Sequence, residues 1–235
     1  MATRFNAPYW RHDAYTLRKL AAAIVDCIGR TQASGVLLED TTVVDLGCGE
    51  APYKTLLTAQ GARYIGCDIE PGGAVDQVID TDGTTALPDG LAQCVTSFQV
   101  LEHVWDLDRY LGECRRLLAE DGLLILSTHG NWLYHPHPTD FRRWTLDGLL
   151  RELTSRGFSI VETWPIVGPL AWTTQFRTLA YHHVLKKLGP VGKLLSAILC
   201  LMMYVRMTLE DKLTPKTLIR NNAAVYLVMA RPQKT

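Results

Sequence analysis

The sequence carries no excess of charge of either sign. Lys and Arg together number 24, and so do Asp and Glu, among 235 residues. A domain that binds nucleic acid through its phosphates usually shows a clear excess of Lys and Arg. The balanced composition therefore predicts a protein without a nucleic-acid partner.

Signals for export and for disulfide or zinc frameworks are also missing. Residues 1–8 are interrupted by the polar Thr3, Arg4 and Asn6 and by Pro8, so they lack the basic and then apolar stretches of a signal peptide. The six cysteines form no C-x-x-C pair. We expect reduced thiols, no metal site and a cytoplasmic protein.

Long hydrophobic runs are scarce. Residues 194–205 form an apolar run of about twelve residues without a charge, and a helix needs ~20 to cross a bilayer. We therefore expect no membrane span here. Three roles stay open: the core, a homodimer interface, or a helix that lies on a membrane or lines a pocket for a lipid-linked substrate. Basic residues within 186–212 favour the last role, a peripheral membrane contact (Lys186, Lys187, Lys193, Arg206 and Lys212).

A glycine-rich turn near residue 45 is the most informative feature that is present. Two valines lead into Asp45, and Gly47 and Gly49 follow in the pattern D-x-G-x-G. β-branched residues before paired glycines are typical of a buried strand that ends in a tight turn, where the backbone approaches a ligand. Further on, Asp68 ends a second apolar segment, where a carboxylate can bind both hydroxyls of a ribose. Together these features predict a nucleoside-containing cofactor.

The glycine spacing separates two classes of cofactor. A dinucleotide-binding loop reads G-x-G-x-x-G and holds a pyrophosphate, but Pro52 occupies the third position here. Asp45 also suits a cation better than a phosphate. S-adenosylmethionine carries an ammonium group and a sulfonium and no phosphate. The turn resembles the glycine loop of class I S-adenosylmethionine-dependent methyltransferases.

Two further segments resemble the same family. S-F-Q-V-L-E-H-V at residues 97–104 resembles the fourth-strand signature of a type 11-like subgroup, which includes ubiquinone-type and many natural-product enzymes. L-L-A-E-D-G-L-L-I-L-S at residues 117–127 resembles the family's helix, glycine turn and fifth strand. The resemblance covers residues 41–163 closely and 223–231 as a final strand. Gln93 and Ala51 depart from it, where the family usually has Asp and often a third Gly.

The resemblance implies S-adenosylmethionine as the cofactor. The residues expected to bind it are Asp45, Gly47, Gly49, Asp68, Ile69, Asp82, Gly83, Gln99 and His103. Ile69 can pack on the adenine ring, and by resemblance an acid contacts the adenine amino group. Asp80 and Asp82 compete for that role, and the spacing to the following Leu-Pro pair favours Asp82. Gln99 begins the loop under the methionine moiety, and His103 is expected to line the pocket rather than act as a base.

The expected elements alternate between strand and helix. We expect strands at residues 42–46, 63–67, 75–80, 93–99, 123–127, 158–164 and 224–230, and helices at 15–29, from residue 52, and at 107–118. This order predicts an α/β, Rossmann-like, doubly wound fold with ligands at the carboxyl ends of the strands. By resemblance the seven-stranded sheet is mainly parallel with an antiparallel last strand.

All of these parts are expected to form one domain. Residues 1–40 would form a helical lid, 41–164 the cofactor-binding core, 165–222 an apolar helical insertion and 223–235 the final strand. In the lid, Tyr9, Trp10, Arg11 and Tyr15 could close over the site. The alternative is a hydrophobic staple for the first helix.

The loop expected at residues 128–145 is dense in His, Trp, Tyr and Pro. Its pattern H-x-x-P-x-D-F-x-R-W-T resembles methyltransferases associated with glycan or secondary-metabolite pathways. We expect His135 or His137 as the base, with Asp140 orienting an imidazole or pairing with Arg143. In the structural alternative, Asp140 and Arg143 form an ion pair and Thr145 caps a helix. A metal site built from the two histidines and Asp140 is disfavoured, since Mg²⁺ prefers carboxylates.

The expected function follows from the nucleophile. A sulfonium is already a good leaving group, so alignment supplies most of the rate, but an attacking alcohol also needs a base. We expect methyl transfer from S-adenosylmethionine to a hydroxyl of a sugar, a glycan precursor or a lipophilic small molecule. The second hypothesis is a non-catalytic cofactor-binding partner in a biosynthetic complex. A nucleotide-dependent oxidoreductase is opposed by Pro52 and the L-E-H segment.

Overall fold

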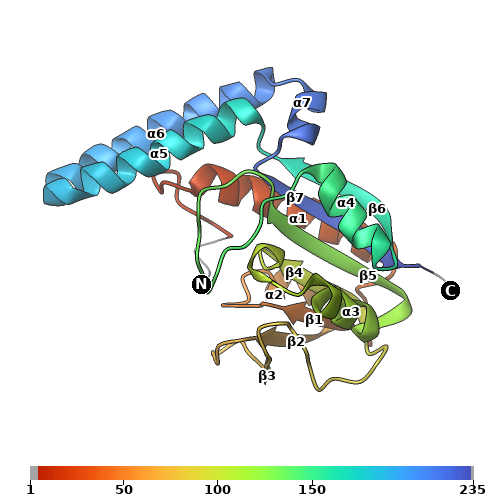
Figure 1. The fold of residues 1–235 in the computed structure, drawn as a ribbon. Helices are drawn as coiled ribbons and strands as arrows, with labels where there is room; N and C mark the ends of the chain where they lie inside the picture. Colours follow the sequence, from red (N-terminus) through yellow and green to blue (C-terminus); the bar gives the residue numbers. More distant parts are fainter. Residues whose placement is uncertain (1–4, 234–235) are drawn as a thin grey trace.

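The computed structural model describes residues 5–233 and contains a seven-stranded sheet between layers of helices (Figure 1). The strands are β1 (Thr42–Leu46), β2 (Arg63–Asp68), β3 (Gln77–Val78), β4 (Ala92–Phe98), β5 (Leu118–His129), β6 (Phe158–Ile166) and β7 (Val225–Pro232). Their order across the sheet is β3-β2-β1-β4-β5-β7-β6. Strand β7 runs antiparallel to β5 and β6, whereas β1 to β5 pair in parallel. The expected mainly parallel sheet with an antiparallel last strand is confirmed.

Helices cover both faces of the sheet. They are α1 (Ala14–Ala33), α2 (Lys54–Leu57), η1 (Leu101–His103), α3 (Leu107–Leu117), α4 (Leu146–Ser155), α5 (Pro169–Leu185), η2 (Lys186–Leu188), α6 (Gly189–Leu213) and α7 (Lys216–Asn221). Successive strand residues face opposite sides. In β7, Tyr226 and Val228 pack with α3 and α4, whereas Leu227 and Met229 pack with α1. The sheet is therefore buried on both faces, as expected for a parallel sheet.

Among the strands, two differ most from their expected bounds. Strand β3 is limited to Gln77–Val78. Beside it, Asp76 binds Gly66 of β2 twice: its backbone N–H donates to the Gly66 carbonyl and its carboxylate accepts the Gly66 N–H, both at 2.8 Å. Strand β5 begins at Leu118 rather than residue 123, since Leu118 pairs with Ala92 through a register shift in β4. It also continues to His129, so the following loop starts two residues later than expected.

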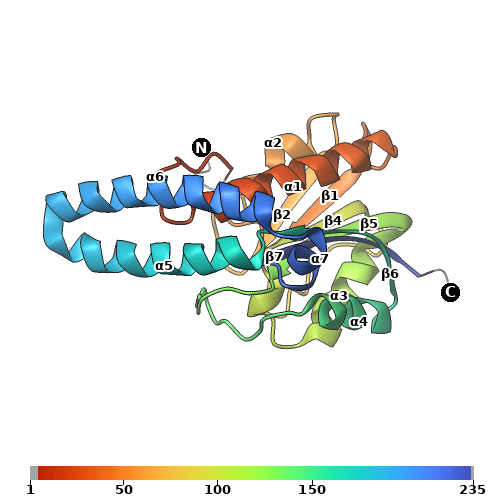
Figure 2. The same cartoon turned by 90° about the horizontal axis from the view of Figure 1, so that it is seen from above.

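A helical hairpin projects from the sheet. Helices α5 and α6 lie side by side, joined through η2, and their free end extends away from the rest of the molecule (Figures 1 and 2). We call this hairpin, Pro169–Leu213, the arm. By length and composition the arm is apolar enough to cross a membrane, with a mean hydropathy of 1.8 in its most apolar window. The twelve-residue run therefore understated the length of the apolar segment.

Candidate functional site

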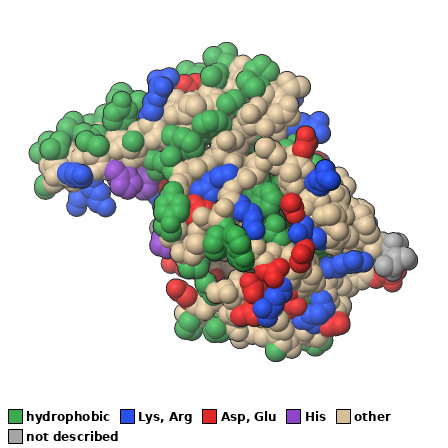
Figure 3. All heavy atoms as spheres, in the orientation of Figure 1, with side chains coloured by type: hydrophobic (Ala, Val, Ile, Leu, Met, Phe, Trp, Pro, Cys, Tyr) green, Lys and Arg blue, Asp and Glu red, His purple; other side chains and the backbone are tan. Residues whose placement is uncertain are grey.

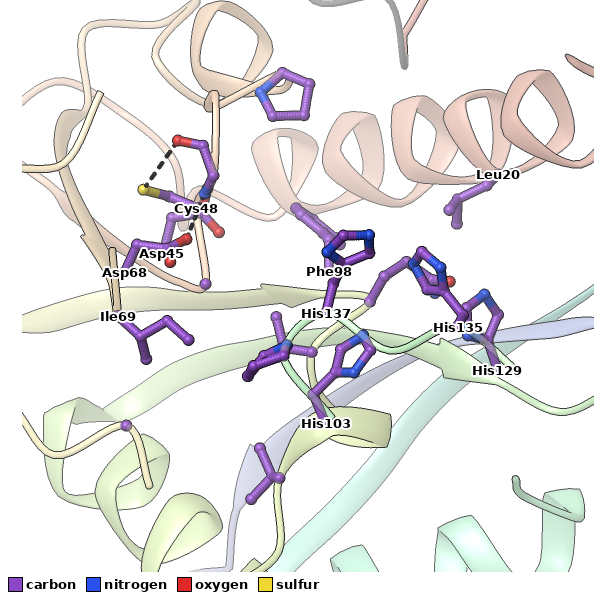
Figure 4. Close-up of a pocket in the computed structure, with 18 of the residues that line it drawn as sticks. Leu20, Asp45, Cys48, Asp68, Ile69, Phe98, His103, His129, His135 and His137 are labelled. Carbon is purple, nitrogen blue, oxygen red and sulfur yellow. Dashed lines mark hydrogen bonds between the residues drawn. The ribbon is translucent and has the colours of Figure 1, made fainter. Parts of the chain in front are cut away.

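A cavity of about 370 Å³ opens at the carboxyl ends of β1, β2 and β4 (Figure 4). Its volume lies in the range of ~300–1,000 Å³ typical of small-molecule sites. The turn after β1, the ends of β2, β4 and β5, the loop at residues 132–138 and the start of α1 all contribute to its wall. This is the edge of the sheet at which an open α/β fold places its ligands.

The turn after β1 brings backbone close to the cavity. Gly47 has a φ of +78°, and a Cβ there would collide with the side chain of Val100. Its N–H donates to the Cys67 carbonyl at 2.8 Å. The Gly49 N–H donates to a carboxylate oxygen of Asp68 at 2.7 Å. The paired glycines therefore let the chain turn between β1 and β2 and bring the two segments predicted to bind the cofactor together.

Asp45 is a buried carboxylate on the cavity wall. It is 3% exposed, and its two oxygens accept from the hydroxyls of Tyr64 at 2.6 Å and Thr96 at 2.7 Å. Burial raises the pKa of Asp45 to about 6, although the two hydroxyls act in the opposite direction and favour the ionised form. A cationic ligand placed beside this carboxylate would favour its ionised form.

At the expected adenine end of the cavity, only one of the two candidate acids, Asp80 and Asp82, lines the wall. Asp68, Ile69, Asp80 and Gly83 line the wall, whereas Asp82 does not. Both Asp80 and Asp82 pair with Arg109, at 3.0 and 2.9 Å. The structure thus places Asp80 where the sequence spacing favoured Asp82. The turn through residues 80–84 is held by the Asp80 carboxylate, which accepts from the Asp82 and Thr84 N–H groups, while the Asp82 carboxylate binds Arg109.

Gln99 and His103 come from the end of β4 and both line the cavity. Gln99 has a φ of +59°, a left-handed conformation that is costly for a non-glycine residue and tends to occur at functional sites. Its side-chain amide donates to the Ser127 hydroxyl at 3.1 Å. His103 Nδ1 lies 2.6 Å from the Thr139 carbonyl oxygen. Because a carbonyl can only accept, Nδ1 carries the proton and Nε2 is left with a lone pair.

Four histidines gather on one side of the cavity (Figure 4). The ring of His135 lies 6.0 Å from that of His129, 5.7 Å from that of His103 and 5.5 Å from that of His137. Burial lowers the pKa of His135, and the neighbouring histidines lower it further. His135 is therefore held neutral near physiological pH, in the form that can accept a proton.

A buried Glu–His pair stands behind these rings. His129 ends β5 and is 6% exposed, and its Nδ1 lies 2.9 Å from Oε1 of the fully buried Glu102. Thr128 donates to the other Glu102 oxygen at 2.9 Å. Burial by itself would raise the pKa of Glu102, but the adjacent His129 outweighs it, and the net pKa lies below the ordinary value. The ring of Trp132 stacks on His129 at 5.4 Å.

Sequence reasoning missed this pair. Glu102 lies inside the L-E-H segment that carries the family resemblance, but in this segment the sequence predicts only its neighbour His103 as a site residue. His129 follows directly on the apolar run of β5, where the carboxyl end of a strand meets the ligand edge of the sheet. That position was the available signal. The contact with Glu102 joins two segments that are 27 residues apart and is visible only in three dimensions.

Asp140 lies outside the cavity wall. Its oxygens accept from the Arg143 guanidinium at 2.5 Å and from the backbone N–H of His135 at 2.7 Å. Burial opposes ionisation, but these donors lower the pKa of Asp140 overall. Asp140 therefore fixes the loop that carries His135 and contacts no imidazole through these bonds. Thr145 caps α4 by accepting from the Gly148 N–H at 3.2 Å. Within residues 5–233, no three potential ligands come together to hold a metal ion.

The N-terminal segment contributes part of the wall. Arg11, Asp13 and Thr16 line the cavity, and Arg11 pairs with Asp13 at 2.6 Å. Tyr15 instead donates to Asp211 of α6 at 2.7 Å, and Tyr9 packs on Tyr204 of the same helix. Of the aromatic residues proposed for a lid, these two thus attach the segment to the arm.

Comparison with known proteins identifies the family. A family model described as a methyltransferase domain matches residues 9–162 of this chain, about two thirds of its length. The chain belongs to this family. S-adenosylmethionine is its cofactor.

Individual relatives of this methyltransferase agree with the family. A protein of Mycolicibacterium smegmatis, described as a probable S-adenosylmethionine-dependent methyltransferase, is 29% identical over 136 residues, which cover 52% of this chain and 53% of that protein. A ubiquinone biosynthesis O-methyltransferase of Cereibacter sphaeroides is 32% identical over 103 residues, which cover 38% of this chain and 42% of that protein. The chain spans about half the length of the curated relatives it matches.

Solved structures share the fold at low identity. The crystal structure of the [4+2]-cyclase SpnF aligns with a TM-score of 0.60 and 16% identity, covering 94% of this chain and 83% of that one. This likeness supports the Rossmann-like architecture. It leaves the reaction to be argued from the site.

The residues of the cavity fit S-adenosylmethionine. The turn at Gly47 gives the close backbone approach that a cofactor in this position requires. Asp45 offers a negative charge to a cationic group. Among the described lining residues, Arg11 is the single Lys or Arg, and it is paired with Asp13. The wall therefore offers little side-chain positive charge to a phosphate and suits a cofactor with positive charge and no phosphate.

Proposed function

We propose that this methyltransferase transfers a methyl group from S-adenosylmethionine to a hydroxyl group of a lipophilic acceptor, such as a lipid-linked sugar or glycan precursor. One observation carries the proposal: an imidazole supported by a buried carboxylate stands on the wall of the cofactor cavity. Methyl transfer to an already anionic or strongly nucleophilic atom does not need such a base, whereas transfer to an alcohol does.

The Glu102–His129 pair supplies the chemistry of a general base. The bound cofactor supplies a methyl group that its sulfonium activates. The neutral imidazole of His129 with its proton on Nδ1, the nitrogen that faces Glu102, carries on Nε2 the lone pair that accepts the hydroxyl proton. The negative charge of the Glu102 carboxylate, 2.9 Å from Nδ1, favours this tautomer and stabilises the imidazolium that forms, as the acid does in a catalytic triad.

His135 and His137 act on the acceptor in this proposal. Both line the cavity beside His129, and the pKa of His135 is lowered by its burial. A neutral His135 can accept a hydrogen bond from the acceptor or relay its proton. Asp140 positions His135 through the backbone and through Arg143. The catalytic roles predicted for His135 and His137 thus become acceptor binding and proton relay beside a deeper base.

Aromatic side chains favour a lipophilic acceptor. Trp132 lines the cavity and packs edge-on against Phe176 of α5 at 6.0 Å, which in turn lies 5.1 Å from Trp172. This row of rings leads from the histidines to the base of the arm. The ubiquinone biosynthesis O-methyltransferase among the relatives also supports transfer to oxygen. The L-E-H segment, which contributes Glu102, supports the proposal that the chain belongs to the type 11-like subgroup.

Methyl-labelled S-adenosylmethionine tests the proposal. Purified protein would be incubated with it and with membrane and soluble extracts of the host, and the products separated into lipid, aqueous-glycan and protein fractions. We expect label in the lipid fraction, as an ether that resists mild alkaline hydrolysis. The Gly47→Val variant, which cannot form the turn, is the matched negative control.

Two results would overturn the proposal. Label in protein, or in a product whose new methyl group is on nitrogen or carbon, would exclude an alcohol acceptor. Cofactor binding without transfer to any fraction would favour the alternative of a non-catalytic partner in a biosynthetic complex.

A further inference from the structure

The arm exposes a continuous apolar face. Nine side chains of α6 recur every three or four residues, which places them along one side of the helix, and each is between 46% and 77% exposed: Val191, Leu194, Leu195, Ile198, Leu201, Met202, Val205, Leu209 and Leu213. We call them the outer stripe. Hydrophobic side chains cover much of the arm in Figure 3. Soluble monomers rarely leave so long an apolar surface uncovered.

The outer stripe does not hold the hairpin together. Helix α6 meets α5 through its small residues Gly192, Ser196 and Cys200, which are buried four residues apart. A Cβ at Gly192 would collide with the backbone of Leu185, so the helices are in close contact there. The Ser196 hydroxyl also lies 2.8 Å from Nδ1 of His182. These close contacts between the two helices are made by residues outside the stripe.

The charge of the arm differs from that of the whole protein. Residues 163–209 contain no Asp or Glu. Pro169–Leu213 carries six basic and two acidic residues, a net charge of +4, whereas the whole chain is neutral. Both acids are engaged, Glu210 with Arg206 at 2.7 Å and Asp211 with Tyr15 at 2.7 Å. The free end of the arm is exposed and basic, with Lys186, Lys187 and Lys193.

We propose that the outer stripe lies flat on a membrane surface that contains anionic lipids. Apolar side chains would enter the boundary of the acyl chains while the lysines bind lipid phosphates, as in interfacial amphipathic helices. The charge-free run between Lys193 and Arg206 is about 18 Å long, shorter than the ~30 Å hydrocarbon core. A flat orientation thus suits α6 better than a transverse one. Two arms of net charge +4 would repel one another, which disfavours a second copy as the occupant.

The position of the arm connects this surface to the active site. Its base is fixed to the body by the Tyr15–Asp211 bond, and Phe176 of α5 contacts Trp132 on the cavity wall. A lipophilic acceptor held in the membrane would therefore be close to the histidines. This part of the inference rests on the proposed function, whereas membrane binding itself does not.

Vesicle flotation tests membrane binding without any substrate. The full-length protein would be mixed with vesicles of phosphatidylcholine alone, and with vesicles that also contain phosphatidylglycerol. We expect it to float with the anionic vesicles and to be released by high salt. Because each lysine near an anionic surface contributes about fivefold to binding, replacing Lys186, Lys187 and Lys193 by Gln should lower the partition coefficient about 100-fold.

A matched pair of variants tests the stripe. Leu195→Gln, Ile198→Gln and Met202→Gln combined should abolish flotation. Val25→Gln, Leu38→Gln and Val161→Gln combined alter three exposed apolar residues on the body and should leave it unchanged. Circular dichroism would show that both variants fold. All of these results are independent of catalysis, so failure of the proposed methyl transfer would not affect them.

Three outcomes would overturn the inference. The first is absence of flotation with either kind of vesicle. The second is binding that resists extraction at high pH, which would mean insertion across the bilayer. The third is a concentration-dependent dimer in sedimentation that the stripe variant dissociates, in protein that binds no vesicles, which would assign the stripe to a second copy.

Discussion

Strand β7 and helix α6 are both rich in apolar residues, but the structure uses them in opposite ways. All six residues from Val225 to Ala230 are buried between the helices of the two faces. Helix α6 has 25 residues, of which only Gly192, Ser196, Cys200 and Met207 are buried. Apolar composition therefore stabilises the fold in one region and leaves a surface available in the other. The difference lies in what surrounds each element.

The histidines of the body and of the arm also differ in their surroundings. In the body, Glu102 and His129 are buried together on the cavity wall. In the arm, His182 and His183 precede Lys186 and Lys187 in the chain, and helix α5 contains no acidic residue that could pair with them. Three comparisons of matched variants would separate these roles, beginning with the largest effect.

Loss of the base should have the largest effect. Replacing His129 by Asn, or Glu102 by Gln, should lower kcat by about 10²–10⁴-fold, because no group then takes the hydroxyl proton efficiently. The cofactor affinity, measured by calorimetry, should change little. His183→Asn on the arm is the matched control and should leave kcat towards a detergent-solubilised acceptor within about twofold. A His129 variant with normal kcat and a raised KM would assign this histidine to acceptor binding instead.

Substitutions in β7 should lower the free energy of unfolding much more than substitutions in the outer stripe of α6. Leu227→Ala in β7 removes a fully buried side chain and should lower the free energy of unfolding by about 2–5 kcal/mol. Leu201→Ala in α6 makes the same change at a side chain that is 50% exposed, and should change it by no more than about 0.5 kcal/mol. Urea unfolding followed by circular dichroism would measure both. Equal losses would mean that the outer stripe is covered within the free protein.

The smallest of the three effects should be a gradual dependence of cofactor affinity on pH. The pKa of Asp45 is raised to about 6 in the absence of ligand, and a cationic ligand favours the ionised form. The affinity should therefore be constant above that pH and fall below it, approaching tenfold per pH unit. Calorimetric titration across this range should show the fall for the wild-type protein and a weaker, flat profile for Asp45→Asn. The Lys186→Gln, Lys187→Gln, Lys193→Gln variant of the arm should keep the wild-type profile.

The same shift has an opposite consequence for the cofactor-free protein. The folded state holds the Asp45 proton more tightly than the unfolded chain does, since its pKa is raised. The contribution of Asp45 to folding stability therefore decreases as the pH rises from the ordinary carboxyl pKa towards about 6. Asp45→Asn should remove this dependence, which thermal unfolding at several pH values would measure.

The sequence was sufficient for the sheet and for the glycine turn beside the cavity. The bounds of β1 agree with the alternation of apolar residues and turns, and the β2 prediction stops one residue short. The residues around D-x-G-x-G and Asp68 lie together on one cavity, because local turn chemistry fixes them. The choice between Asp80 and Asp82 differed from the structure, since it depends on which carboxylate the turn uses for its own hydrogen bonds.

The sequence by itself determined the order of strands and helices, the glycine turn and the family. These depend on residue types close together in the chain, whose backbone preferences and hydrophobic spacing are local properties. Only the tertiary structure decided that Glu102 faces His129, that Asp140 lies outside the cavity wall, and that the outer stripe of α6 stays exposed among the described residues. Each of these is a matter of burial and pairing between distant segments, and the free energy of a charge or an apolar side chain depends on those surroundings.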